Sequence, residues 1–114
     1  MVVIADNIIY VEKILDLYLS LPETPAHSSQ DDIRSAHDLC RRKTPLEIVE
    51  AALLLASVRR LYRDPALPRL TPIRSLRYFL PVIDELTLSP LTGDYLLYLH
   101  YKLDAFVAKN SLSK

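Results

Sequence analysis

The stretch TPLEIVEAALLLASVRRL, from Thr44 to Leu61, decides the fold. From Leu46 to Val58 almost every residue is apolar, and a helix that is apolar around its whole circumference has to be buried on all sides. The order Thr44, Pro45, Glu47 is typical of a helix start, with an N-cap, a first helical residue and a capping-box partner. The stretch therefore predicts a buried central helix over about 44–63.

Four further helical segments flank this central helix. They are expected at about 6–21, from Ser28 or Ser29 to 42, from Thr71 and Pro72 to 86, and at 92–109. The second should bury Ile33, Ala36, His37 and Cys40, and the fourth should bury Ile73, Leu76, Leu80 and Ile83. The sequence predicts one all-α domain over residues 1–114, a compact bundle of about five helices.

Composition excludes several classes of function. The chain has one glycine, Gly93, so phosphate-cradling loops, dinucleotide fingerprints and nucleophile elbows cannot be built. His37 and Cys40 could supply two ligands, whereas a structural zinc site needs four. The acid pairs Asp31–Asp32 and Asp84–Glu85 are neighbours on a helix, so their side chains point apart and do not converge on a substrate. We expect no enzyme activity, no metal and no cofactor. A single cysteine and the lack of a long apolar run favour a cytoplasmic protein that does not span a membrane.

The charges are unevenly distributed although they cancel overall. Residues 1–40 carry seven acids against two bases, residues 41–77 carry nine bases against three acids, and residues 78–114 carry four acids against three bases. A strongly basic segment indicates either a surface for a polyanion or head-to-tail assembly.

Arginine supplies most of the basic segment, and its planar fork suits phosphate oxygens and guanine edges. In the alternative interpretation these arginines stabilise helix C-termini and pair with acids of the first helix. Arg74 and Arg77 fit that alternative less well, because they are expected in the first turns of the fourth helix, where the dipole prefers acids. Pro81 should kink that helix. The candidate nucleic-acid-binding residues are Arg59, Arg60, Arg63, Arg69, Arg74, Ser75 and Arg77.

Aromatic and aliphatic side chains are abundant on the two terminal helices. Tyr95, Tyr98 and Tyr101 are expected to bury their rings and leave their hydroxyl groups in water, although base stacking is the functional alternative. The first helix carries more apolar surface than one face of a small bundle hides, which predicts a homodimer or a protein partner there.

The segments Pro45–Leu61 and Pro72–Leu86 together resemble the C-terminal helical module of DnaD-like primosomal and phage replication proteins. Tyr78, Phe79 and Ile83 match that family's pattern, and Leu86 stands where the family usually has tryptophan. The resemblance implies binding to DNA and to replication proteins. The same region is similar to a helix-turn-helix unit, with Thr71, Arg74 and Ser75 at the recognition positions, although the linker is longer than the usual turn.

Two hypotheses follow from the sequence. The first is a small DNA-binding or replication-accessory protein, of a phage or mobile element, that contacts the phosphate backbone through its arginine-rich centre. The second is a non-enzymatic protein–protein interaction module, either a homodimer or an adaptor that docks a helix.

Overall fold

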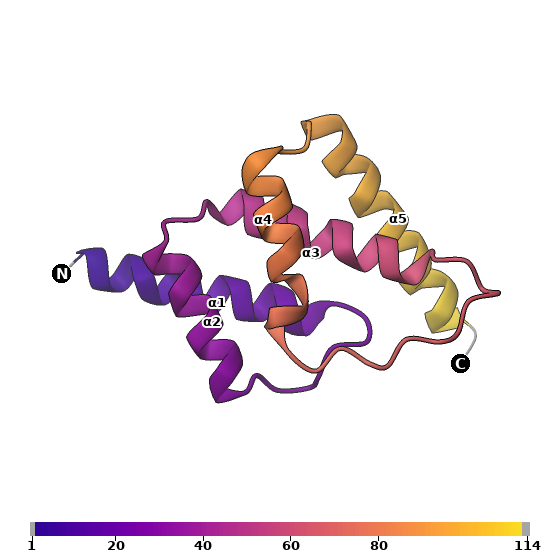
Figure 1. The fold of residues 1–114 in the computed structure, drawn as a ribbon, viewed down its shortest axis with the longest axis horizontal. Helices are drawn as coiled ribbons and strands as arrows, with labels where there is room; N and C mark the ends of the chain where they lie inside the picture. Colours follow the sequence, from indigo (N-terminus) through magenta and orange to yellow (C-terminus); the bar gives the residue numbers. More distant parts are fainter. Residues whose placement is uncertain (1, 113–114) are drawn as a thin grey trace.

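The computed structural model describes the backbone of residues 2–112 and the side chains of residues 7–109. It is an all-α bundle, as predicted, and the described part contains no strand. Figure 1 shows the elements: α1 (Val2–Ser20), α2 (Gln30–Arg41), α3 (Leu46–Leu61), the short 3₁₀ helix η1 (Leu76–Phe79), α4 (Leu80–Leu88) and α5 (Gly93–Leu112).

Helix α3 is the centre of the bundle, which confirms the prediction made from its apolar run. It packs against α1, α4, η1 and α5, and every residue from Ala51 to Val58 is buried. The largest fully buried side chains around it come from other elements and include Tyr18 and Phe79. The rings of these two residues pack edge to face, with their centroids 6.0 Å apart. Residues far apart in sequence therefore close one core around α3.

The predicted cap of α3 is wrong. Pro45 is the N-cap residue and makes no side-chain cap bond, while its carbonyl accepts hydrogen bonds from Ile48 and Val49. Thr44 is buried and held by other helices instead: its N–H donates to the carbonyl of Leu39 at 3.1 Å, and its own carbonyl accepts from the Tyr10 hydroxyl at 2.7 Å. The backbone of Thr44 thus ties α3 to α1 and α2.

The predicted start of the fourth helix is also wrong. Thr71 and Pro72 lie in a non-helical segment, and Ser75 caps η1 by accepting a hydrogen bond from the N–H of Arg77. Pro81 then occupies the first turn of α4, where a missing N–H breaks no helical hydrogen bond, so it does not kink a helix interior. Thr71, Arg74 and Ser75 therefore do not lie in a helix, where they were expected.

Helix α2 begins as predicted but buries a different face. Ser29 and Asp32 form the capping box, and Asp32 is only 1% exposed because its carboxylate also accepts the N–H of Leu76 at 2.9 Å. The buried residues are Asp32, Ser35, Ala36 and Leu39, whereas His37 is exposed and Ile33 and Cys40 are half-buried. The bond to Leu76 fixes the rotation of α2 that places Asp32 inside.

Helix α5 is a peripheral element. Thr92 caps it, because its hydroxyl accepts the N–H of Tyr95, as the predicted boundary implies. Its main contacts are with α3, and of its large apolar side chains Leu99 is buried at 1% exposure while Leu97 and Tyr101 are each 69% exposed. Tyr95 and Tyr98 are exposed too, so the expectation of buried tyrosine rings on this helix is wrong.

Candidate functional site

The linker 62–75 returns from the end of α3 to η1, and the predicted arginines other than Arg77 lie around one residue, Arg60. Figure 1 shows it leaving the body of the bundle and running back beneath it. Its far end is anchored, because Ile73 is buried and its N–H donates to the Glu23 carbonyl at 3.0 Å. The surface around this segment, formed by Arg59, Arg60, Arg63, Arg69, Leu70, Arg74 and Tyr78, is called the linker surface below.

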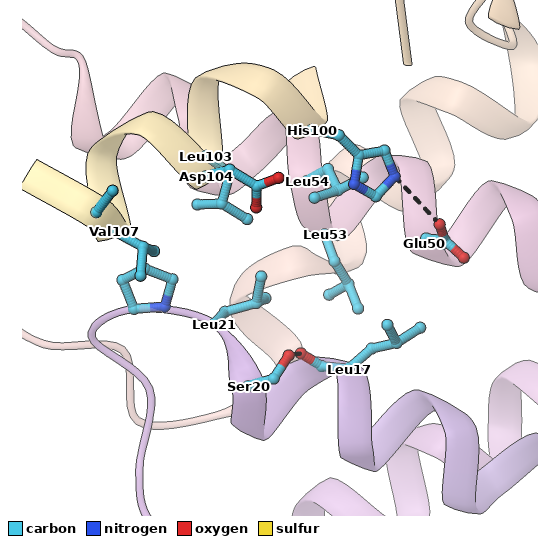
Figure 2. A pocket seen from close by; sticks show the side chains of 12 residues that line it. Leu17, Ser20, Leu21, Glu50, Leu53, Leu54, His100, Leu103, Asp104 and Val107 are labelled. Carbon is cyan, nitrogen blue, oxygen red and sulfur yellow. Dashed lines mark hydrogen bonds and ion pairs between the residues drawn. The ribbon is translucent and has the colours of Figure 1, made fainter. Parts of the chain in front are cut away.

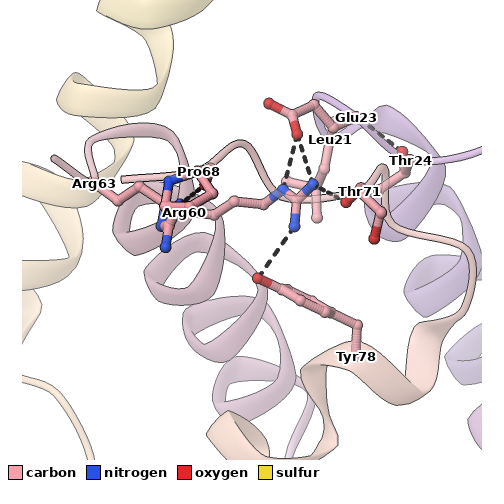
Figure 3. Close-up of polar contacts among 8 residues, drawn as sticks. All are labelled: Leu21, Glu23, Thr24, Arg60, Arg63, Pro68, Thr71 and Tyr78. Carbon is pink, nitrogen blue, oxygen red and sulfur yellow. Dashed lines mark hydrogen bonds and ion pairs between the residues drawn. The ribbon is translucent and has the colours of Figure 1, made fainter. Parts of the chain in front are cut away.

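Arg60 is the internal anchor of this surface. Its side chain is 4% exposed and forms an ion pair with Glu23 at 2.8 Å. Figure 3 shows the guanidinium between Glu23, the carbonyl of Thr71 and the hydroxyl of Tyr78, and it also lies over the Tyr78 ring, 5.4 Å from the centroid. Burial lowers the pKa of Arg60, but the hydrogen bonds to Tyr78 and Glu23 outweigh that effect and leave it raised.

Two other candidate arginines are exposed and bound to acids. Arg59 makes a two-pronged contact with Glu85 of α4 at 2.9 and 2.7 Å; this hydrogen bonding raises the pKa of Arg59 and lowers that of Glu85. Arg77 bonds Asp31 of α2 at 2.7 Å, and the Ser75 hydroxyl donates to the same carboxylate at 3.4 Å. A phosphate would have to compete with these carboxylates for either arginine.

The remaining three candidates have no carboxylate partner among the described side chains. Arg63 donates to the backbone carbonyl of Pro68, and Arg69 and Arg74 are exposed, with no hydrogen-bond or ion-pair partner within residues 7–109. Their charge is therefore available to an external anion.

Three shallow pockets around Arg60 join these residues into one surface. One of about 260 Å³ is lined by Arg59, Arg60, Arg63 and Tyr78 and has no carboxylate in its lining. The second, of about 270 Å³, adds Arg69 and is also lined by the carboxylates of Glu23 and Asp64. The third, of about 320 Å³, adds Arg74 and Ser75. The fold thus brings together Arg59, Arg60, Arg63, Arg69, Arg74 and Ser75, whereas Arg77 lines none of these pockets and points to α2.

A second concave region was not predicted from the sequence. A pocket of about 460 Å³ lies between the end of α1, one side of α3 and the part of α5 from His100 onward, and is called the apolar groove below. Figure 2 shows Leu17, Leu21, Leu53, Leu103 and Val107 around it. Its charged lining residues are Glu50 and Asp104, and His100 lies 3.5 Å from Glu50. The excess of apolar residues on α1 and α5 is the only sequence signal for this groove.

Other kinds of site find no support in the described part of the chain. No group of three or more histidine, cysteine or acidic side chains there is placed to hold a metal ion. None of the described helices has the length and apolar character needed to cross a membrane.

Compared with models of protein families, with curated proteins and with solved structures, the chain matches none. The resemblance to DnaD-like modules and to a helix-turn-helix unit therefore stays a prediction.

Proposed function

We propose that the chain binds the phosphate backbone of DNA through the linker surface. The observation that carries this proposal is that Arg63 and Arg69 line one pocket and Arg74 lines a second, both beside Arg60, and that none of the three forms an ion pair with a described carboxylate. Arginine forks bond phosphate oxygens bidentately, and backbone contacts of this kind supply most sequence-independent affinity for DNA. A replication-accessory role, in a phage or mobile element, is what the resemblance to DnaD-like modules adds.

The proposal narrows the set of contacting residues expected from the sequence. Arg60 is enclosed by Glu23, Thr71 and Tyr78 and serves to hold the linker in place. Arg59 and Arg77 already have acidic partners. Exposed ion pairs are weak, so these two arginines can contribute to a phosphate contact only after releasing Glu85 or Asp31.

A pair of matched double variants tests this assignment. Arg69→Ala with Arg74→Ala removes two charges from the linker surface, and Arg34→Ala with Lys109→Ala removes two exposed charges elsewhere. Affinity for duplex and for single-stranded DNA is measured at several salt concentrations. The first variant should weaken binding and flatten the salt slope by about two, roughly one for each phosphate that is no longer bound. Equal reductions in both variants would contradict a localised site.

Thermal unfolding of the same proteins separates binding from folding. Arg69 and Arg74 anchor nothing in the described structure, so their removal should change the free energy of unfolding by no more than about 0.5 kcal/mol each. A large loss of stability would mean that both arginines have a structural role instead.

We also propose a second candidate function, a protein–protein interaction module. It is favoured by the apolar groove and by the exposed Leu97 and Tyr101 on the adjoining helix α5. Concave, mostly apolar surfaces and contiguous exposed apolar side chains mark interaction sites. The homodimer or partner predicted on α1 remains a prediction, with Ile8 and Ile9 both 51% exposed there.

A further inference from the structure

The apolar groove has a specific electrostatic character. Its walls are leucine and valine side chains, including Leu53 from α3 and Leu103 and Val107 from α5. Glu50 and Asp104 are the acidic groups in its lining, and neither lysine nor arginine lines it. An occupant that matches this groove therefore presents an aliphatic side chain with a basic group next to it.

The linker carries that combination. Leu67 is 48% exposed and Leu70 is 44% exposed, and Arg69 stands between them in sequence. In Figure 1 the linker projects past the end of α3 before it turns back. Covering the exposed leucines of this loop would remove apolar surface from water and so stabilise a complex.

The linker is also held in a defined shape. The Leu67 N–H donates to the Asp64 carbonyl at 3.0 Å, and the Ala66 N–H donates to the Asp64 carboxylate at 2.9 Å. Pro65 and Pro68 restrict the backbone on either side of Leu67. A segment that is already ordered loses little conformational entropy on binding.

The linker cannot fill the groove of its own chain. Arg60 holds the Thr71 carbonyl, Arg63 holds the Pro68 carbonyl, and Ile73 is bonded to Glu23. None of the linker residues 62–75 lines the groove. A second molecule is therefore needed to bring the two surfaces together.

We propose that the apolar groove binds the linker of a second copy of this chain, with Leu67 among the groove leucines and Arg69 facing Asp104. The inference rests on the second candidate function, the interaction module, and names its partner. Each copy offers one groove and one linker, so the pair closes as a two-fold dimer if both contacts form between the same two copies, and otherwise the contact repeats from copy to copy. Because Arg69 also belongs to the proposed DNA surface, saturating duplex DNA should dissociate the assembly.

A charge-exchange experiment tests this contact. Neither Asp104 nor Arg69 has a described hydrogen-bond or ion-pair partner, and both are exposed, so Asp104→Arg and Arg69→Asp should fold as the wild type does. Sedimentation velocity over a concentration series measures self-association of each protein alone and of an equimolar mixture of the two variants. Ile9→Asp, at an exposed position of α1 outside the groove, is the control for association through the first helix.

The wild type and Ile9→Asp should associate with concentration. Each charge variant alone should associate at least about tenfold more weakly, because like charges then face each other. The mixture should regain association, since the basic groove of Asp104→Arg then meets the acidic linker of Arg69→Asp, and the two unchanged surfaces meet each other. Asp104→Arg should retain DNA binding, which separates a failure of this inference from a failure of the proposed DNA function.

Three results would overturn the inference. The first is a wild type that stays monomeric at high concentration. The second is association that survives both charge variants but is lost in Ile9→Asp, which would place the contact on α1. The third is a mixture of the charge variants that associates no better than either variant alone.

Discussion

Helices α3 and α5 are both rich in apolar residues, and they differ in how many elements cover them. Helix α3 is packed by α1, α4, η1 and α5, so its side chains from Ala51 to Val58 are all buried. Helix α5 rests mainly on α3, and Leu97 and Tyr101 face solvent. An apolar sequence pattern therefore predicts that a surface needs covering, and only the arrangement of neighbours shows whether the same chain covers it.

The largest expected effect contrasts one leucine from each helix. Leu53→Ala on α3, where the side chain is 1% exposed, should lower the free energy of unfolding by about 2–5 kcal/mol, because a cavity remains. Leu97→Ala on α5, at 69% exposure, should change it by no more than about 0.5 kcal/mol. Urea unfolding of both variants makes the measurement. Similar losses at the two positions would mean that α5 is covered as thoroughly as α3.

The basic ends of the two helices provide the next contrast. Arg60→Ala, at the end of α3, should cost about 1–3 kcal/mol, because it leaves the Thr71 carbonyl and Glu23 without their buried donor. Lys109→Ala, in the last turns of α5, should be near neutral because Lys109 is exposed. Thermal unfolding under one set of conditions compares the two. A neutral Arg60→Ala would show that the linker is not anchored through this residue.

Two tyrosines of α1, Tyr10 and Tyr18, should make the stability of the fold fall at high pH. Burial raises the pKa of both Tyr10 and Tyr18 from 10 to about 12. Both are therefore more easily ionised in the unfolded chain, and the stability that they contribute is present below pH 10 and lost as the pH rises toward 12. Tyr10→Phe with Tyr18→Phe should reduce this loss, measured by urea unfolding at about pH 9 and about pH 11.5.

The smallest expected effect on stability is at the hydroxyl of Tyr18. This residue is fully buried, and its oxygen has no hydrogen-bond partner among the described residues. Tyr18→Phe alone should therefore be neutral or stabilise the fold by up to about 1 kcal/mol at neutral pH, because an unsatisfied polar group is removed. Urea unfolding of this variant decides the matter, and a destabilisation of more than about 1 kcal/mol would indicate a partner for the hydroxyl.

Local sequence patterns predicted the existence of the helices better than their ends. The apolar run of α3 and the capping pair Ser29 and Asp32 are short-range signals, and both are confirmed. The Thr-Pro pairs at positions 44–45 and 71–72 carry the same local signal, yet neither threonine caps a helix. Bonds from other parts of the chain occupy these backbones instead: the Tyr10 hydroxyl, 34 residues away, donates to the Thr44 carbonyl, and the Ile73 N–H donates to the Glu23 carbonyl.

The sequence predicts which residues belong to the candidate site, but not their partners. The charge pattern identifies the arginine-rich segment, and it does not show which arginines lie next to an acid in the folded protein. Arg77 pairs with Asp31, 46 residues away in sequence, and Arg59 pairs with Glu85, 26 residues away. Arg74 was expected in a helix and lies in the non-helical segment before η1. The distinction between arginines held by carboxylates and arginines without them needed the fold.

The central claim is that Arg63, Arg69 and Arg74 meet phosphate groups, and the salt dependence of wild-type binding to duplex DNA tests it most directly. Three phosphate contacts predict that the logarithm of the association constant falls against the logarithm of salt concentration with a slope of about −2.7. A slope near zero, or no binding at low salt, would contradict the claim and leave the interaction module as the function to pursue.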